Sequence, residues 1–383
     1  VLAQLDRLSV GRLRICDGPE IRAFGNGEGP EATITVMDAA FYPEIAFGGS
    51  VGAAESYMLG HWRADDLTTV MRVMLRNEDA LGGMERGLAR LAAPMRRLAH
   101  WLRRNTRAGS RRNISAHYDL GNDFFRLMLD ETMMYSCALF ERADMTLAEA
   151  QFAKLDRICR ALALGPSDHV FEIGTGWGGF AIHAASRYGC RVTTTTISPS
   201  QFELAQERIR QAGVSGRVTL LLEDYRDVRG SFDKLVSIEM IEAIGYRQYD
   251  EFFRRAAALV RPGGSMALQS ITVADRHYLR TRDEVDFIKR YIFPGACIPS
   301  VGALAAAAAA SGALQVVALD DIGPHYATTL AAWRRNFFGN LPAVRDLGYP
   351  ETFIRMWEYY LCYCEAGFAE RQLGDVQVVL ARA

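Results

Sequence analysis

A glycine-rich turn with an acidic residue just before it is the first feature of this chain that could do chemistry. Glu172 lies near the end of the apolar run 170–173, and Gly174, Gly176 and Gly178 follow directly before an expected helix. Glycine lets the backbone take a positive φ and approach a ligand closely. A dinucleotide site is the alternative, but the spacing G-T-G-W-G-G departs from the usual pyrophosphate pattern. The carboxyl group of Glu172 favours a ligand that is cationic or carries hydroxyl groups over one that carries phosphate.

Glu242 is a second acidic residue in a place where sites form, because it follows the fourth expected strand, 234–238. Sites in open α/β sheets gather beyond the carboxyl ends of the strands, which favours a functional role over that of a surface acid. Cys137 has two open interpretations, as a small buried hydrophobic residue or as part of the site. An attacking thiolate is not expected, because no Cys–His–Asn arrangement is apparent. Tyr326 is open in the same way, between packing and a role in the site.

An alternation of helices and strands that begins near residue 150 has to position these residues. The expected helices are 147–164, 179–188, 199–212, 249–260 and 353–369, and the expected strands are 169–173, 191–196, 218–222, 234–238, 265–270 and 376–380. Such alternation predicts an α/β fold in which a doubly wound, mostly parallel sheet carries helices on both faces.

Residues 1 to about 80 carry no catalytic signature. Short β-like runs at 32–36 and 45–47 are followed by a helical stretch over 66–76. From Arg86 to Arg112, nine arginines occur without an Asp or Glu, and apolar residues recur between them at helical spacing. This basic amphipathic segment could lie on an anionic lipid surface, or it could be a linker helix that packs on the next domain. A nucleic-acid role is disfavoured, because little aromatic interleaving accompanies the arginines.

Composition describes an ordinary globular chain. Its 383 residues suffice for two or three domains, and the formal net charge of -1 gives no electrostatic case for a nucleic-acid binder. Seven scattered cysteines predict a reduced, cytosolic protein, and no metal site is expected at Cys362 and Cys364, which point to different sides of a helix. The window 298–319 is expected to be a buried helix followed by a strand rather than a membrane span. No secretion signal is visible, although the missing Met leaves the start open.

The strand and glycine turn resemble the E/DxGxGxG signature of class I S-adenosylmethionine-dependent methyltransferases; a nicotinamide or flavin site is the alternative. The resemblance implies that the turn lies under the methionine part of the cofactor and that the acid helps to hold it. It also implies that the segment after the second strand lies near the ribose and the segment after the third lies near the adenine. The residues implied to bind the cofactor are Tyr118, Glu172, Gly174, Gly176, Gly178, Thr196, Ser198, Gln201, Asp224 and Tyr225.

Five further segments make the resemblance more specific. They are HYDLGNDFF at 117–125, MYSCA at 134–138, EMIEAIG at 239–245, FIKRYIFPG at 287–295 and HYATTL at 325–330. Together they resemble the cyclopropane-fatty-acyl-phospholipid synthase family, which includes the mycolic acid methyltransferases, over about residues 110–383. The resemblance implies a catalytic domain with a seven-stranded methyltransferase sheet over 113–383. It also implies a basic linker over 86–112, and a smaller N-terminal α+β domain over 1–85 that binds lipid and pairs subunits into a homodimer.

The chemistry of that family explains why such residues are wanted. An isolated cis double bond is a weak nucleophile, so water has to be excluded and the sulfonium methyl held in line with the π cloud. Methyl transfer leaves a carbocation that aromatic faces can stabilise, and a base then removes a proton so that the ring closes. The candidate aromatic residues are Tyr135, Tyr246, Tyr291, Phe293, Tyr326 and Trp333.

In the resembling enzymes the base is a bound bicarbonate. The groups implied to hold it are Cys137, Glu242, Gln269, Ile271 and Tyr326. Gln269 departs from the family pattern, which has His at this position. An amide can donate an N–H to an anion but cannot relay protons, which leaves the fate of the cation open.

The sequence thus predicts an enzyme that uses S-adenosylmethionine and bicarbonate to form cyclopropane rings on unsaturated phospholipids of a bilayer. It is expected to be cytoplasmic and peripheral at the inner membrane surface, without a nucleic-acid partner. One alternative is a lipid C-methyltransferase that gives a methyl or methylene branch, and Gln269 keeps it open. Another is a non-catalytic lipid-binding protein, which would predict an eroded glycine turn. A small-molecule methyltransferase would not need all five segments.

Overall fold

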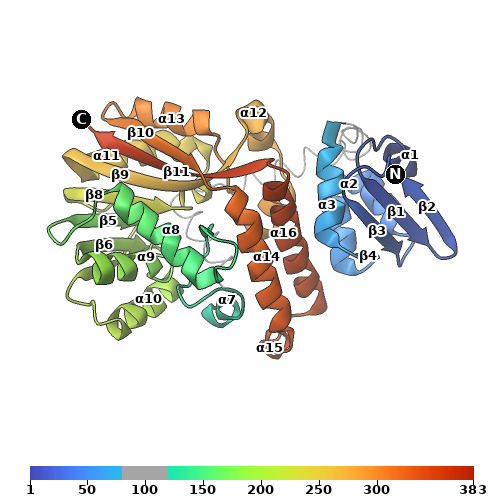
Figure 1. The fold of residues 1–383 in the computed structure, drawn as a ribbon, viewed down its shortest axis with the longest axis horizontal. Coiled ribbons are helices and arrows are strands. Elements are labelled where there is room, and N and C mark those ends of the chain that lie inside the picture. The colour runs from blue at the N-terminus through green and yellow to red at the C-terminus, as the bar shows by residue number, and fades with distance from the viewer. Residues whose placement is uncertain (80–119) are drawn as a thin grey trace. The chain divides into compact units, whose positions relative to one another are not determined.

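The computed structural model describes residues 1–79 and 120–383, and contacts along the chain divide it into two compact units (Figure 1). Of the described residues, 1–79, 283–294 and 330–372 form the first unit, and 120–282, 295–329 and 373–383 form the second. The predicted domain boundaries at 85 and 113 lie outside the described residues and stay predictions. The contacts add that two later segments, 283–294 and 330–372, group with the N-terminal residues.

The first unit contains a four-stranded mixed sheet in the order β2-β1-β3-β4. Its strands are β1 (Arg12–Asp17), β2 (Glu20–Phe24), β3 (Glu31–Val36) and β4 (Trp62–Ala64), and its helices are α1 (Leu2–Leu5), α2 (Phe41–Leu59), α3 (Leu67–Arg76), α15 (Leu341–Asp346) and α16 (Glu351–Ala369). Helix α16 packs on α2 and α3. Glu370, just after α16, accepts hydrogen bonds from Arg72 (2.6 Å) and Arg76 (2.7 Å) of α3.

The strand at 32–36 and the helix at 66–76 are confirmed as β3 and α3, but the β-like run at 45–47 is wrong because these residues lie inside α2. Phe41 and Ile45 are both buried, whereas Phe47 is 58% exposed. Burial of residues four apart is the helical period, and three residues with β propensity are too few to override it.

The second unit is built on a seven-stranded sheet in the order β10-β11-β9-β8-β5-β6-β7. The strands are β5 (His169–Ile173), β6 (Arg191–Thr196), β7 (Val218–Leu222), β8 (Phe232–Ile238), β9 (Val260–Val273), β10 (Leu314–Asp321) and β11 (Leu373–Arg382). The pairs β5–β6, β5–β8, β6–β7 and β8–β9 are parallel, and β11 runs antiparallel to both of its neighbours. The predicted doubly wound, mostly parallel sheet is confirmed.

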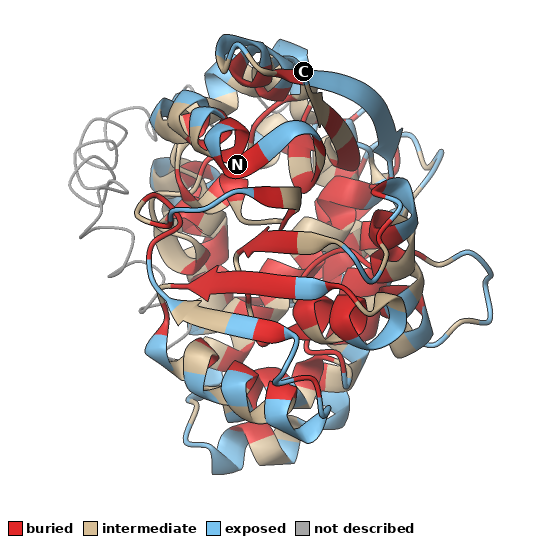
Figure 2. Ribbon diagram, turned by 90° about the vertical axis from the view of Figure 1, so that its left-hand side faces the viewer, coloured by how far each residue is buried: buried red, intermediate tan, exposed pale blue. Residues whose placement is uncertain are grey.

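Helices cover both faces of this sheet. The α-helices described in this unit are α7 (Asn122–Met128), α8 (Leu147–Ala161), α9 (Gly179–His183), α10 (Pro199–Gln211), α11 (Tyr249–Leu259), α12 (Asp275–Asp283), α13 (Val301–Ala310) and α14 (Pro324–Gly339), the last of which continues into the first unit, and α8 to α11 and α13 pack on the sheet. Phe171 of β5 packs in a core cluster with α11 and α13, and its neighbour Val170 packs in a second cluster with α8 and α9. Adjacent residues of one strand thus pack into two different hydrophobic cores, one on each face of the sheet. Figure 2 shows buried residues along the strands and the inward faces of the helices.

The window 298–319 forms α13 followed by β10, as expected, but it is less buried than predicted. In α13 the buried residues are Leu304, Ala307 and Ala308, and β10 is exposed at every residue after Leu314 because it is an edge strand. Across residues 1–79 and 120–383, every helix is too short or too polar to cross a membrane.

Candidate active site

The glycine turn lies between the end of β5 and the start of α9. Gly174, Gly176 and Gly178 have φ values of 95°, 52° and 86°, which other residues rarely adopt. A Cβ on Gly176 would meet no atom of the described residues within 4 Å, so the turn borders open space at the carboxyl end of β5. A bare backbone that faces open space at this edge suits close approach by S-adenosylmethionine, which supports the fit of the predicted cofactor.

Glu172, two residues before this turn, is buried and accepts a 2.6 Å hydrogen bond from the hydroxyl of Thr194 in β6. Burial raises the pKa of this carboxyl group to about 8. A cationic ligand beside it would favour the ionised form and lower that pKa again. The charge of Glu172 is therefore expected to depend on whether a cationic ligand is bound beside it.

Thr196, Ser198 and Gln201 form one network at the start of α10. Ser198 is the N-cap and its hydroxyl accepts from the backbone N–H of Gln201 (3.3 Å), while the Thr196 hydroxyl donates to the side-chain Oε1 of Gln201 (2.9 Å). Asn122, in the HYDLGNDFF segment, accepts from Trp177 in the glycine turn (2.7 Å) and donates to the carbonyl of Ser200 (3.2 Å). This amide joins the turn to α10, which places the two predicted parts of the cofactor site side by side.

Asp224 and Tyr225, predicted to lie near the adenine, have different surroundings. Asp224 is buried, and its two oxygens accept from the guanidinium of Arg226 at 2.9 and 2.6 Å. The Tyr225 ring packs edge-on against Phe252 in the core below α11. Their roles stay predictions, and Tyr118 lies outside the described residues.

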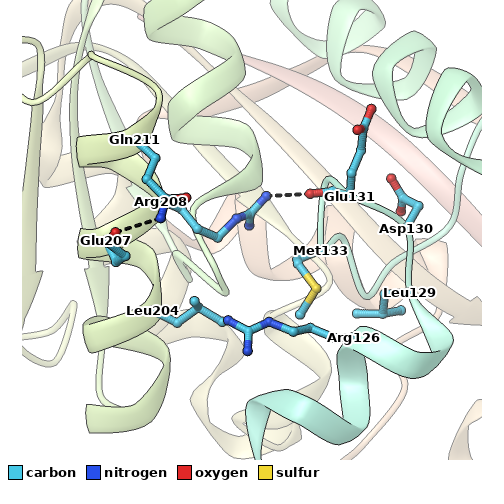
Figure 3. Close-up of a pocket in the computed structure, with 9 residues that line it drawn as sticks. All are labelled: Arg126, Leu129, Asp130, Glu131, Met133, Leu204, Glu207, Arg208 and Gln211. Atoms are coloured by element: carbon cyan, nitrogen blue, oxygen red, sulfur yellow. Dashed lines mark hydrogen bonds between the residues drawn. The ribbon is translucent and has the colours of Figure 1, made fainter.

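A pocket of about 350 Å³ lies beside this network, between α7, α10 and the loop that follows α7 (Figure 3). Figure 3 shows Arg208 of α10 reaching across to the backbone of Glu131, to which it donates at 2.7 Å. Arg208 also donates to the carbonyl oxygens of Thr132 (3.0 Å) and Trp177 (2.6 Å). The pocket lining is Arg126, Leu129, Asp130, Glu131, Met133, Leu204, Glu207, Arg208 and Gln211, a charged set that does not suit an acyl chain. Through these hydrogen bonds Arg208 connects α10 to the glycine turn and to the loop after α7, and we call this its bracing role.

The five residues predicted to hold bicarbonate come together at the carboxyl ends of β8 and β9, and three of them surround Glu239. The backbone N–H of Cys137 and the amide of Gln269 both donate to its Oε1 at 2.8 Å. The Tyr326 hydroxyl donates to its Oε2 at 2.7 Å. Gln377 donates to Oε1 of Gln269 (3.1 Å), which turns the Gln269 N–H groups toward the acids.

The other two predicted residues contact each other. Glu242 accepts at Oε1 from the backbone N–H of Ile271 (2.6 Å) and from the hydroxyl of Ser270 (2.9 Å). Its Oε2 is buried and has no hydrogen-bond partner among the described residues. Burial, and next the charge of Glu239, raise the pKa of Glu242 to about 8.

Two buried ionisable residues that the sequence analysis did not select complete the cluster. Asp375 of β11 accepts from Gln269 (3.1 Å), and burial, with Glu239 next, raises its pKa well above the ordinary value. Lys154 of α8 donates to Ser136 Oγ (2.7 Å); burial lowers its pKa to about 8, while the charge of Glu239 opposes that shift. Burial also raises the pKa of the Cys137 thiol, and a thiol that keeps its proton is a poor nucleophile.

Glu239, Lys154 and Asp375 were not selected from the sequence, each for a different reason. Glu239 lies inside a quoted segment and at the end of a predicted strand, so the signal was present. Lys154 lies on a helix whose charged residues look like a solvated face, and Asp375 was one residue outside the predicted last strand. Of the candidate aromatic residues, Tyr135, Tyr246 and Tyr326 belong to the second unit, and Tyr291, Phe293 and Trp333 belong to the first.

A glycine turn after the first strand of a seven-stranded sheet, one antiparallel strand near its edge, and a polar cluster beyond the strand ends define a class I methyltransferase. Comparison with known proteins gives the family. The mycolic acid cyclopropane synthetase family matches residues 105–378, and the chain belongs to this family.

Similar proteins span most of the chain. Tuberculostearic acid methyltransferase UfaA1 of Mycobacterium tuberculosis is 41% identical over 352 residues, which are 87% of this chain and 79% of that protein. Cyclopropane-fatty-acyl-phospholipid synthase of Escherichia coli is 38% identical over 360 residues, which are 93% of this chain and 89% of that protein. The structure of mycolic acid cyclopropane synthase CmaA1 complexed with SAH and CTAB aligns with a TM-score of 0.66 and 33% identity, over 71% of this chain and 98% of that one.

These findings confirm the predicted family and fold, and this chain is an S-adenosylmethionine-dependent methyltransferase. The resemblance was expected over about residues 110–383, but the alignment with the Escherichia coli protein covers 93% of the chain. The similarity therefore extends into the N-terminal unit.

Proposed function

We propose that this enzyme adds a methylene unit from S-adenosylmethionine to the cis double bond of an unsaturated phospholipid acyl chain and closes a cyclopropane ring. The main support is that all five residues predicted to hold the proton acceptor lie in one cluster, in a chain whose family is named for this chemistry. The relative from Escherichia coli is named for the same product on phospholipid.

When bound, S-adenosylmethionine supplies an electrophilic methyl group on a sulfonium. The glycine turn at 174–178 and the Thr196–Gln201 network would hold it, with Glu172 beside it as the acid whose ionisation a cation favours. Hydrogen bonds of Arg208 and Asn122 connect the glycine turn to α10.

The residues of the polar cluster then take part in removing a proton from the alkylated acyl chain. After the double bond has taken the methyl group, the acyl chain carries a positive charge next to the newly substituted carbon. Loss of a proton from the new methyl carbon leaves an electron pair that forms the third side of the ring. The family resemblance predicts a bound bicarbonate as the acceptor of this proton, held by Cys137, Glu242, Gln269, Ile271 and Tyr326; the proposed product does not depend on whether the acceptor is bicarbonate or a carboxylate of the chain.

A second candidate is a methylene branch. The same cation leads to a methylene branch if a hydride first moves from the methyl-bearing carbon to the neighbouring cationic carbon. The methyl group then loses its proton, and a C=CH₂ double bond forms. Gln269 in place of His favours this candidate, because the residue next to the acceptor cannot relay a proton. The relative UfaA1, named a methyltransferase, favours it as well.

The lipid surface and the pairing of subunits remain part of the proposal. The basic segment 86–112, which would contact anionic lipid, lies outside the described residues. Its nine arginines give about 1 kcal/mol of attraction each when close to an anionic surface. We propose that the enzyme is peripheral to the cytoplasmic membrane surface and acts as a homodimer.

The test is incubation of purified protein with S-adenosylmethionine and vesicles of a cis-unsaturated anionic phospholipid, followed by mass spectrometry and proton NMR of the fatty acids. A product one methylene heavier with cyclopropane proton signals supports the first candidate. An isomer of the same mass with signals of a methylene group on the chain supports the second. Unchanged lipid from a protein that binds S-adenosylmethionine would overturn both.

A further inference from the structure

Glu239 makes the contacts that the family resemblance assigns to bicarbonate. Its carboxyl group is bound by the Cys137 N–H, the Gln269 amide and the Tyr326 hydroxyl, at 2.8, 2.8 and 2.7 Å. These donors come from segments more than 80 residues away from Glu239 along the chain or from the neighbouring strand, so the fold converges on this one side chain. Three of the five residues predicted for an external anion thus hold a carboxyl group that the chain supplies itself.

The hydrogen bonds suit an ionised Glu239. A carboxylate accepts at both oxygens, and here Oε1 receives two N–H donors and Oε2 receives an O–H donor. The buried Lys154 lies close enough for its charge and that of Glu239 to interact. The cluster therefore supplies both the donors and the positive charge that an anion at this position needs.

The two neighbouring acids are less suited to accept a proton. Glu242 and Asp375 are buried, and burial raises the pKa of Glu242 to about 8 and that of Asp375 well above its ordinary value. Burial therefore favours the protonated form of both side chains, and a carboxyl group that already carries a proton cannot accept another. Glu239 is half-buried and is the least buried of the three acids.

The backbone of Glu239 has a strained conformation, and this conformation directs the side chain into the cluster. Its φ of 47° lies in the left-handed region, where a residue other than glycine is uncommon. Such strain persists where the surroundings hold it, and it clusters at functional sites. Here the Glu239 N–H donates to the Gln269 carbonyl oxygen at 2.9 Å, which fixes the turn just after β8 that directs the side chain into the cluster.

Resting on the function proposed above, we propose that Glu239 is the proton acceptor of the reaction and that this enzyme needs no external bicarbonate. The π electrons of the acyl double bond form the new C–C bond, and the electrons of the S–CH₃ bond stay on sulfur. A C–H bond of the new methyl group then breaks; its electron pair closes the ring, or forms the methylene double bond after a hydride shift, and its proton goes to a carboxylate oxygen of Glu239.

The test measures alkylated lipid with purified full-length enzyme in buffer depleted of CO₂ and in the same buffer with added bicarbonate. Wild-type turnover is expected to be equal in the two buffers. Glu239→Gln keeps the size of the side chain and one accepting oxygen but removes its basicity, and turnover is expected to fall by about 100-fold or more. Glu203→Gln, an exposed residue of α10, is the matched control and is expected to keep the wild-type rate.

Glu239→Gly is the second variant, because it removes the carboxylate, relieves the positive φ and leaves the three donors in place. It is expected to fold, to bind S-adenosylmethionine like the wild type, and to regain turnover when bicarbonate or formate is added. The proposal is overturned if wild-type turnover requires bicarbonate, or if Glu239→Gln turns over at the wild-type rate. If the wild type alkylates no lipid in either buffer, the proposed function itself fails, which is a different outcome.

Discussion

Replacing Glu242 by Gln should weaken the dependence of stability on pH. In the folded protein the pKa of Glu242 is raised to about 8, mainly by burial, from an ordinary value of 4.5. Between these values the folded state keeps the proton and the unfolded chain releases it, so stability falls as the pH rises, by about 1.4 kcal/mol per pH unit. From pH 5.5 to pH 7.5 this one group costs the wild type about 2.5 kcal/mol. Gln cannot titrate, so the variant escapes that loss.

The measurement is urea-induced unfolding of both proteins at pH 5.5 and pH 7.5, with the free energy of unfolding extrapolated to water. The difference between Glu242→Gln and the wild type should move by about 2.5 kcal/mol in favour of the variant as the pH rises. Glu20→Gln, which removes the charge of an exposed side chain in the other unit, is the control for loss of one carboxylate. Parallel pH dependences for wild type and Glu242→Gln would refute the conclusion that the folded protein holds Glu242 protonated.

Two further substitutions test other parts of the site. Arg208→Ala removes three hydrogen bonds to backbone carbonyls; the free energy of unfolding should fall by about 3 kcal/mol and calorimetry should show weaker S-adenosylmethionine binding. The exposed Arg210→Ala on the same helix should change stability by less than about 0.5 kcal/mol, and equal effects of the two would contradict the bracing role. Lys154→Met should abolish a stability gain of about 2 kcal/mol between pH 8 and pH 10, since the pKa of Lys154 is lowered to about 8 and the unfolded lysine keeps its proton to higher pH. Unfolding curves at pH 8 and pH 10 measure the free energy of unfolding of both proteins. If the variant gained as much stability as the wild type, the gain would come from a group other than Lys154.

Much of the catalytic fold could be predicted because its strands are short apolar runs separated by helical periods. The strands at 169–173, 191–196 and 218–222 match β5, β6 and β7 residue for residue. Boundaries failed where local signals conflict with pairing: β9 begins at Val260, before the Pro262–Gly264 turn signal, and the helix expected over 179–188 changes to a π-helical turn at Ala184. Partner strands and packing decide such places, and neither is visible in a local window.

The candidate site could be predicted as a set of residues but not as an arrangement. The motifs indicated that Cys137, Gln269 and Tyr326 act together, and the structure brings them into one cluster. The sequence could not show that Glu239 would lie among them, because the contact between Cys137 and Glu239 spans 102 residues. Buried charges such as Lys154 escape pattern reasoning for a related reason, since a charged residue on a helix usually faces solvent.

The account is tested most directly by reaction with S-adenosylmethionine that carries a trideuterated methyl group, with vesicles of a cis-unsaturated phospholipid as acceptor. Mass spectrometry then counts the deuterium atoms in the product fatty acid. A carboxylate that takes its proton from the newly added methyl carbon predicts a product that retains two deuterium atoms, whether the product is a ring or a methylene branch. A product that retains three would show that the proton leaves from another carbon, and it would contradict the account.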